Sequence, residues 1–219
     1  MELNGKKIVF LGDSITQGCG TSDISKVYWN VIAQRTGAKC YGYGIGGTRI
    51  APQRIPTVER SWEDQYFATR VERMEPEADV VVVFGGTNDF GHGDAAFGQM
   101  TDRTNDTFCG AFHLLLQKLI ERYPNAKIVV MTPMHRLSED EAYYNEFGIR
   151  RAGKLVRYVD AIKEIAGFYG AAVVDLFRQC QIQPRVDIMR QKFMPDGLHP
   201  NDAGNAMVAD CLLGVLKEL

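Results

Sequence analysis

The chain has 219 residues, of which 45% are hydrophobic and 24% are charged, and its formal net charge at pH 7 is −2. This composition suits a globular protein with a sizeable core, and we expect residues 1–219 to form a single domain. No basic run occurs, so the sequence argues against a nucleic-acid partner, which would need clustered positive charge. The longest aliphatic run, residues 80–84, is far too short to cross a bilayer, so we expect no membrane contact of that kind.

The N-terminal residues carry no longer apolar stretch and no small-residue cleavage site, which argues against a secretory signal. The five cysteines are an odd number, are widely spaced and include no CxxC pair. This usage is typical of reduced thiols rather than of a disulfide framework or a zinc site. We therefore expect a cytoplasmic protein.

Apolar runs of strand length recur along the chain at residues 7–11, 39–43, 79–84, 127–131 and 171–176. They are rich in Val and Ile, and they are too uniformly apolar for a sheet with one solvated face. Strands that helices bury on both faces, in a parallel sheet, have this composition.

Segments with helical spacing lie between and after these runs, at residues 104–123, 152–169 and 201–219. The repeated β-then-α order predicts an α/β fold, specifically a three-layer α/β/α sandwich around a parallel sheet of about five strands. Spacing alone does not determine the strand order. In such sheets the binding crevice lies beyond the carboxyl ends of the strands.

The first expected strand runs directly into the sequence GDSIT at residues 12–16. Since serine after a strand commonly caps the next helix, capping is the plain interpretation of Ser14. The serine is not inside a GxSxG motif, so an ordinary α/β-hydrolase is not indicated. Gly12 would nevertheless let a substrate approach, and the turn after it would direct backbone N–H groups at developing negative charge.

The sequence DGLHP at residues 196–200 places a histidine three positions after an aspartate. A serine is a poor nucleophile until a histidine takes its proton, and that histidine needs an acidic partner to fix its tautomer. A lone histidine before proline is usually a loop residue, but the aspartate predicts that His199 and Asp196 serve Ser14 together. No pair of histidines has metal-ligand spacing, so we expect no metal.

A glycine cluster, GYGIGG at residues 42–47, follows the second expected strand. It matches the GxGxxG dinucleotide-binding fingerprint, with Glu63 and Asp64 downstream. That fingerprint should open a helix at once, whereas Pro52 and Pro56 follow closely, so we expect no nucleotide cofactor. We expect no other cofactor either. A flexible turn is the plain interpretation, and a glycine N–H that binds an oxyanion fits at least as well.

Asn88 follows the third expected strand within the sequence GGTND at residues 85–89. These residues make good turns, which is the plain interpretation of the segment. The amide of Asn88 would also offer a donor where a substrate carbonyl oxygen becomes negative. With Ser14 and His199, it predicts a serine esterase.

These fragments, in this order, resemble the SGNH hydrolase superfamily, also called GDSL-type esterases and lipases. The resemblance spans residues 12–200 and is carried by Gly-Asp-Ser, by Gly-x-Asn-Asp at residues 86–89 and by Asp-x-x-His-Pro at residues 196–200. It implies a flavodoxin-like α/β/α sandwich and hydrolysis of carboxylic esters through an acyl-enzyme. The implied roles are nucleophile for Ser14, general base and acid for His199, orienting acid for Asp196, and oxyanion donors for Ser14, Gly47 and Asn88.

Two positions depart from the family pattern. Ile15 stands where the name-giving leucine occurs, which is a conservative change. Gly42 stands where an asparagine usually opens the second family block, so the choice between Gly46 and Gly47 as oxyanion donor stays open.

The motifs do not select among acetylesterase, lipase and thioesterase. The resemblance to intracellular bacterial-type members implies short acyl chains, among them acetyl groups on a carbohydrate. Residues 49–62 and 135–151 are expected to decide specificity, although ordinary solvated loops are the plain interpretation of both. We expect substrate contacts from Asp13, Trp62, His92 and Tyr143.

Three alternatives stay open. The exposed aromatic side chains expected in these loops fit a homo-oligomer interface as well as the face of a sugar. A thioesterase or lysophospholipase-type acyl hydrolase is one alternative function. A catalytically silent carbohydrate-binding protein of the same fold is another, although it would have no need of the full set of Ser14, Asn88, Asp196 and His199.

Overall fold

The structure is a computed structural model, and it describes residues 1–140 and 153–219. In this part of the chain five strands form one sheet in the order β2-β1-β3-β4-β5, and every neighbouring pair is parallel. The strands are β1 (Lys7–Gly12), β2 (Lys39–Gly44), β3 (Val80–Phe84), β4 (Lys127–Met131) and β5 (Ala172–Val174). The expected parallel sheet is therefore confirmed.

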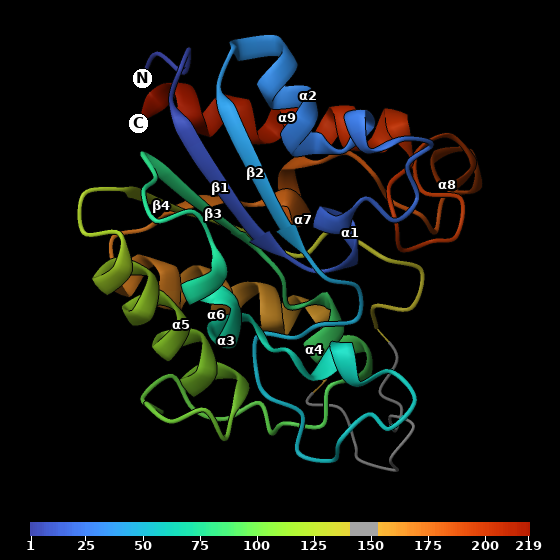
Figure 1. The fold of residues 1–219 in the computed structure, drawn as a ribbon. Helices are drawn as coiled ribbons and strands as arrows, with labels where there is room; N and C mark the ends of the chain where they lie inside the picture. The colour runs from blue at the N-terminus through green and yellow to red at the C-terminus, as the bar shows by residue number, and fades with distance from the viewer. Residues whose placement is uncertain (141–152) are drawn as a thin grey trace.

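Helices cover both faces of the sheet (Figure 1). One face carries α2 (Tyr28–Thr36), α7 (Leu176–Gln179) and α9 (Asp202–Glu218), and the other carries α3 (Phe67–Arg70), α5 (Phe108–Arg122) and α6 (Leu155–Phe168). The short helices α1 (Ser14–Gln17) and α4 (Thr87–His92) follow β1 and β3, and α8 (Asp187–Phe193) precedes α9. Single 3-10 turns complete the order: η1 (Ile24–Lys26), η2 (Ser61–Asp64) and η3 (Val71–Arg73). The three-layer α/β/α sandwich is confirmed.

Two expected elements are shorter in the structure, because a polar side chain caps a helix at each boundary. The helix expected over residues 104–123 begins at α5, since Thr107 accepts a hydrogen bond from a backbone N–H of the first turn. The strand expected over residues 171–176 ends early, since Asp175 caps α7 in the same way. The helices expected over residues 152–169 and 201–219 correspond to α6 and α9.

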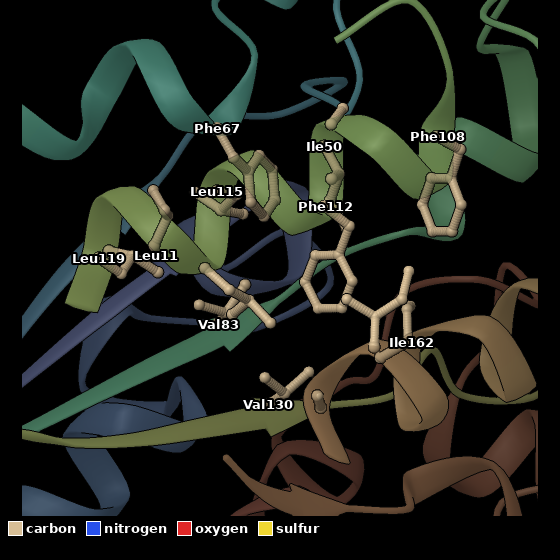
Figure 2. Packing of buried hydrophobic residues seen from close by; sticks show 14 of the residues in the cluster. Leu11, Ile50, Phe67, Val83, Phe108, Phe112, Leu115, Leu119, Val130 and Ile162 are labelled. Atoms are coloured by element: carbon tan, nitrogen blue, oxygen red, sulfur yellow. The ribbon is translucent and has the colours of Figure 1, made fainter. Parts of the chain in front are cut away.

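The larger of two cores fills the space between the sheet and the helices α5 and α6 (Figure 2). Val83 of β3 lies there against Phe112 and Leu115 of α5, and all three side chains are at most 1% exposed. Burying a large apolar side chain contributes about 1.5–3 kcal/mol, so this layer holds the sheet rigidly against the helices. The loops at the strand ends therefore project from a fixed base.

The strand order places a topological switch point between β1 and β3. The chain leaves β1 toward β2 on one side and leaves β3 toward β4 on the other. Ligand crevices of open α/β sheets lie at such points, outside the carboxyl ends of the strands. Ser14 lies two residues after the end of β1 and Asn88 lies four residues after the end of β3, so both flank this crevice.

Candidate active site

Ser14 is the first residue of α1, and only Asp13 separates it from the end of β1. The N-cap of this helix is Asp13, whose Oδ1 accepts a hydrogen bond from Ile15 N at 3.0 Å. The plain interpretation of Ser14 as a cap is therefore wrong, and its hydroxyl is available for chemistry. The expectation that Gly12 leaves room for a substrate is also wrong, because a Cβ there would lie 2.0 Å from Oγ1 of Thr16. Gly12 instead lets α1 pack closely against the end of β1.

The hydroxyl of Ser14 meets the imidazole of His199 across the crevice, with 2.9 Å between Oγ and Nε2. The other ring nitrogen, Nδ1, lies 2.6 Å from Oδ2 of Asp196. A carboxylate beside Nδ1 keeps the proton on that nitrogen, which leaves Nε2 able to accept the serine proton. The three side chains thus form a continuous hydrogen-bonded chain from carboxylate to hydroxyl.

Asp196 also accepts hydrogen bonds through its other oxygen from the backbone N–H groups of Leu198 and His199, at 2.9 and 2.7 Å. Burial alone would raise the pKa of Asp196, but these bonds and the one from the His199 ring outweigh it and hold the pKa below its ordinary value. The carboxylate is therefore ionised at neutral pH. Its side chain is 54% exposed, so this acid works at the surface of the protein.

The loop after β2 carries Gly46 and Gly47, and a Cβ built on Gly46 would lie 3.7 Å from Cβ of Ser14. The N–H of Gly46 donates to Oε1 of Gln17 at 2.6 Å, so it is already engaged. Within the described residues the N–H of Gly47 has no backbone or side-chain acceptor, and the φ of Gly47 is +76°. This difference favours Gly47 over Gly46 as an oxyanion donor.

Asn88 lies on α4 with 5% of its surface exposed. Its Nδ2 donates one proton to the carbonyl oxygen of Thr48 at 3.0 Å, which fixes the plane of the amide. An amide nitrogen carries two protons, so the second one can serve another acceptor. The backbone N–H of Ser14, that of Gly47 and this amide proton together can stabilise an oxyanion.

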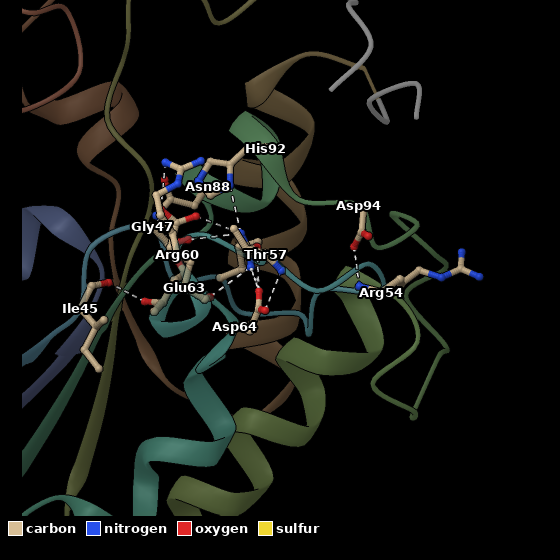
Figure 3. Close-up of polar contacts among 12 residues, drawn as sticks. Ile45, Gly47, Arg54, Thr57, Arg60, Glu63, Asp64, Asn88, His92 and Asp94 are labelled. Carbon is tan, nitrogen blue, oxygen red and sulfur yellow. Dashed lines mark hydrogen bonds and ion pairs between the residues drawn. The ribbon is translucent and has the colours of Figure 1, made fainter. Parts of the chain in front are cut away.

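The loop that carries Gly47 is held by a buried polar cluster (Figure 3). The guanidinium of Arg49, which is 2% exposed, donates to Asp64 at 2.9 Å and to the carbonyl oxygen of Glu63 at 3.0 Å. Its Nη1 also lies 3.0 Å from Nδ1 of His92. Since arginine only donates, Nδ1 of His92 is the acceptor and the ring proton is on Nε2.

Asp89 ties the same loop to α4 from the other side. Its two carboxylate oxygens accept hydrogen bonds from Ile50 N at 3.0 Å and Ala51 N at 2.9 Å. Burial raises the pKa of Asp89 to about 6, against the lowering effect of these two bonds. Burial likewise raises the pKa of Asp13 to about 6.

The four expected substrate contacts have different positions. Trp62 lies in η2 and is 49% exposed, as a stacking residue must be, whereas Asp13 is 1% exposed and engaged in capping. His92 shares α4 with Asn88 and is partly exposed. Tyr143 is outside the described residues, as is most of the expected specificity segment 135–151. All four contacts stay predictions.

Sequence reasoning missed the buried arginines Arg49 and Arg70 and did not separate Asp89 from turn chemistry. No local pattern marks an arginine as buried, so the sequence held no signal for Arg49 and Arg70.

Among residues 1–140 and 153–219, no cluster of three or more His, Cys, Asp or Glu side chains could hold a metal ion. In the same residues, every helix is too short or too polar to cross a bilayer.

Comparison with known proteins shows which family the sequence resembles. The model of the GDSL-like lipase/acylhydrolase family matches residues 10–207. A curated relative, a GDSL lipase from Mycobacterium tuberculosis, is 25% identical over 209 residues, which cover 93% of this chain and 78% of the relative.

Solved structures resemble the whole chain. A protein from Lactobacillus plantarum is 27% identical with a TM-score of 0.81, and the match covers 98% of both chains. The acetyl xylan esterase AlAXEase is 26% identical with a TM-score of 0.59, over 95% of this chain and 98% of that one. A possible lipase from Chitinophaga pinensis has a TM-score of 0.68 at 22% identity, over 97% of this chain and 98% of that one, which supports the fold alone.

Proposed function

The chain belongs to the GDSL-like lipase/acylhydrolase family and is a carboxylic ester hydrolase, and we propose that Ser14, His199 and Asp196 perform the hydrolysis. The observation that carries this proposal is the continuous chain of contacts, 2.9 Å from Ser14 to His199 and 2.6 Å from His199 to Asp196. Nucleophile, base and orienting acid stand in the order that acyl transfer requires.

In the first half of the reaction, Oγ of Ser14 attacks the ester carbonyl carbon while Nε2 of His199 takes the hydroxyl proton. The negative carbonyl oxygen is stabilised by the backbone N–H groups of Ser14 and Gly47 and by the amide of Asn88. The C–O bond to the alcohol then breaks, His199 gives its proton to the departing oxygen, and the acyl group stays on Ser14.

In the second half, a water molecule attacks the acyl carbon while His199 takes one of its protons. The same three donors stabilise the second oxyanion, and Ser14 leaves with the proton from His199. Asp196 stays ionised throughout and stabilises the imidazolium that forms in each half. The products are a carboxylic acid and an alcohol.

Short acyl esters, including acetyl groups on a carbohydrate, are the substrates we propose. The similarity to an acetyl xylan esterase supports this class. The indole of Trp62 supports it too, because a half-exposed aromatic face suits contact with a sugar ring. A panel of esters from acetyl to long acyl, with acetylated xylan included, tests the assignment. A preference for long acyl esters or thioesters would contradict it.

The proposed nucleophile is tested with Ser14→Ala. We expect kcat for p-nitrophenyl acetate to fall at least about 10⁴-fold, because the loss of a triad nucleophile removes the acyl-enzyme route. The parent protein should also gain the mass of a fluorophosphonate probe, and S14A should not. The matched control is Ser22→Ala, since Ser22 is exposed and its hydroxyl donates to Asp202. An S14A variant that is folded and as active as the parent would disprove the role of Ser14, and a parent protein that stays unlabelled would favour a silent binding protein.

A further inference from the structure

One buried guanidinium joins three backbone segments behind the crevice. Arg70, at the end of α3, is 4% exposed. Its Nη1 donates to the carbonyl oxygen of Tyr43 at 2.9 Å, and its Nη2 donates to that of Gly12 at 2.9 Å and to Oγ1 of Thr48 at 3.1 Å. These acceptors belong to the end of β2, the end of β1 and the glycine loop. The proposed nucleophile follows Gly12 by two residues, and Gly47 directly precedes Thr48.

Thr48 extends this connection to the third proposed donor. Its hydroxyl accepts from Arg70 and donates to the carbonyl oxygen of Ile45 at 2.7 Å. Its own carbonyl oxygen accepts from Nδ2 of Asn88 at 3.0 Å. Thr48 is 1% exposed, so water does not compete for these bonds. Arg70 therefore contacts, directly or through one residue, every segment that supplies an oxyanion donor.

The acceptors that Arg70 uses in the described residues are all neutral oxygens. Burying a cation without a hydrogen-bonded carboxylate is costly, and a neutral side chain could tie the same oxygens at a lower cost. Burial lowers the pKa of Arg70 to about 10, against the opposing effect of the nearby Asp13 charge. The guanidinium is thus still charged at neutral pH, and it contacts Gly12, two residues before Ser14, and Thr48, directly after Gly47.

We propose that Arg70 is a positioning residue that holds the three oxyanion donors in register, and that its positive charge favours the negative intermediate. The inference rests on the proposed function of Ser14, Gly47 and Asn88. Donors that are already aligned cost no reorganisation when charge develops, and a misplacement of about 1 Å can cost about 100-fold in rate. The effect should therefore fall on the transition state and not on substrate binding.

The test compares Arg70→Met, Arg70→Lys and the control Arg122→Met. Arg70 lies over the ring of Phe67, 4.8 Å from its centroid. Arg122 is a fair control because its guanidinium likewise donates to a backbone carbonyl, that of Met74, and lies over the ring of Tyr123, but on α5 away from the crevice. For R70M we expect kcat for p-nitrophenyl acetate to fall about 100-fold with KM changed less than about twofold. For R70K, which keeps the charge but loses the fork, we expect a loss of about 10-fold. R122M should keep the parent kcat.

An inhibitor separates positioning from a merely structural role. A trifluoromethyl ketone forms a hemiketal oxyanion with an active serine, so its Ki should rise in R70M by about the factor by which kcat falls. If R70M does not fold, Thr48→Val removes one acceptor of Arg70 and should give a loss of about 10-fold in both quantities. The inference would be overturned if R70M kept the parent kcat and Ki, or if kcat fell while Ki stayed unchanged. If R70M does not fold, the same outcomes in T48V would overturn it.

The two proposals fail in different ways. If S14A keeps the parent activity, the proposed nucleophile is wrong and the inference about Arg70 falls with it. If S14A is inactive while R70M keeps the parent kcat and Ki, only the inference about Arg70 is wrong.

Discussion

Glu63 packs so closely against Gly47 that a Cβ on Gly47 would lie 2.4 Å from Cδ of Glu63. The backbone at Gly47 also has a φ of +76°, a conformation that residues with a Cβ rarely adopt. Two independent requirements, space and backbone conformation, therefore call for glycine at this position. Both act on the N–H that we propose as an oxyanion donor.

Gly47→Ala should consequently lower kcat by about 100-fold or more, because the loop must move to make room for the methyl group and the N–H moves with it. The left-handed conformation should cost about 1–2 kcal/mol of stability in addition. Kinetics with p-nitrophenyl acetate and urea unfolding measure the two effects separately.

Gly170→Ala is the matched control, since Gly170 has a φ of +66° and a Cβ there would meet nothing within 4 Å. It should lose a similar amount of stability and keep the parent kcat. Equal activities for G47A and the parent would show that the N–H of Gly47 takes no part in the reaction.

Asp196→Asn should lower kcat by about 10³–10⁴-fold, because an amide does not stabilise the imidazolium of His199 and favours the wrong tautomer. The lowered pKa of Asp196 keeps this group ionised across the neutral range. The titration of Asp196 itself should therefore not shape the parent profile between about pH 5 and 8, and D196N should be less active than the parent throughout this range. Profiles of kcat against pH for D196N and for Asp187→Asn, an exposed aspartate of α8, provide the measurement. A loss confined to one end of the profile would contradict the assignment.

Local patterns were enough to predict the sheet and the two ends of the site. The inner strands are mostly apolar, and Val80–Phe84 is buried over its whole length, which is typical of a parallel sheet covered by helices. Ser14 and His199 were found because each lies in a motif of residue types that carry chemistry. Their meeting at 2.9 Å, 185 positions apart in the chain, follows from the common edge at which parallel strands end.

The strand order and the supporting residues could not be predicted, because both depend on contacts between distant segments. The local sequence of a strand does not say which strands lie beside it. The edge position of β2, whose residues are partly exposed, could therefore not be predicted. Arg70 contacts Gly12, 58 positions away, and Asp89 contacts Ile50, 39 positions away. An arginine or aspartate in a short helix has the same neighbours in sequence whether its side chain is solvated or buried.

Phe112→Ala should destabilise the protein by about 3–5 kcal/mol, because Phe112 is 0% exposed and the shortened side chain leaves a cavity between α5 and the sheet. Phe168→Ala is the matched control on α6, where the ring is 68% exposed, and it should change stability by less than about 1 kcal/mol. Urea unfolding of both variants tests this. Equal losses would mean that the layer in Figure 2 is not the stabilising core.

Asp89 is a buried acid whose titration should appear in the stability of the protein. Burial raises its pKa to about 6, from an ordinary value of 3.8. Between these two pH values the folded state binds more protons than the unfolded state, so the contribution of Asp89 to stability falls as the pH rises. That contribution is most favourable near pH 4 and is lost by about pH 7.

Asp89→Asn removes this titration and keeps the size of the side chain. Like a protonated aspartate, the amide can accept from only one of the two N–H donors, Ile50 and Ala51, so D89N should resemble the parent most at low pH. Relative to the parent, its free energy of unfolding should then rise by roughly 2–3 kcal/mol between pH 4 and pH 7. Asp102→Asn is the control, because hydrogen bonds from Gln99 N and Thr107 lower the pKa of Asp102 and place its titration below pH 4, so D102N should change little relative to the parent between pH 4 and pH 7. Urea unfolding at several pH values tests this, since parallel curves for D89N and the parent would mean that folding does not raise the pKa of Asp89.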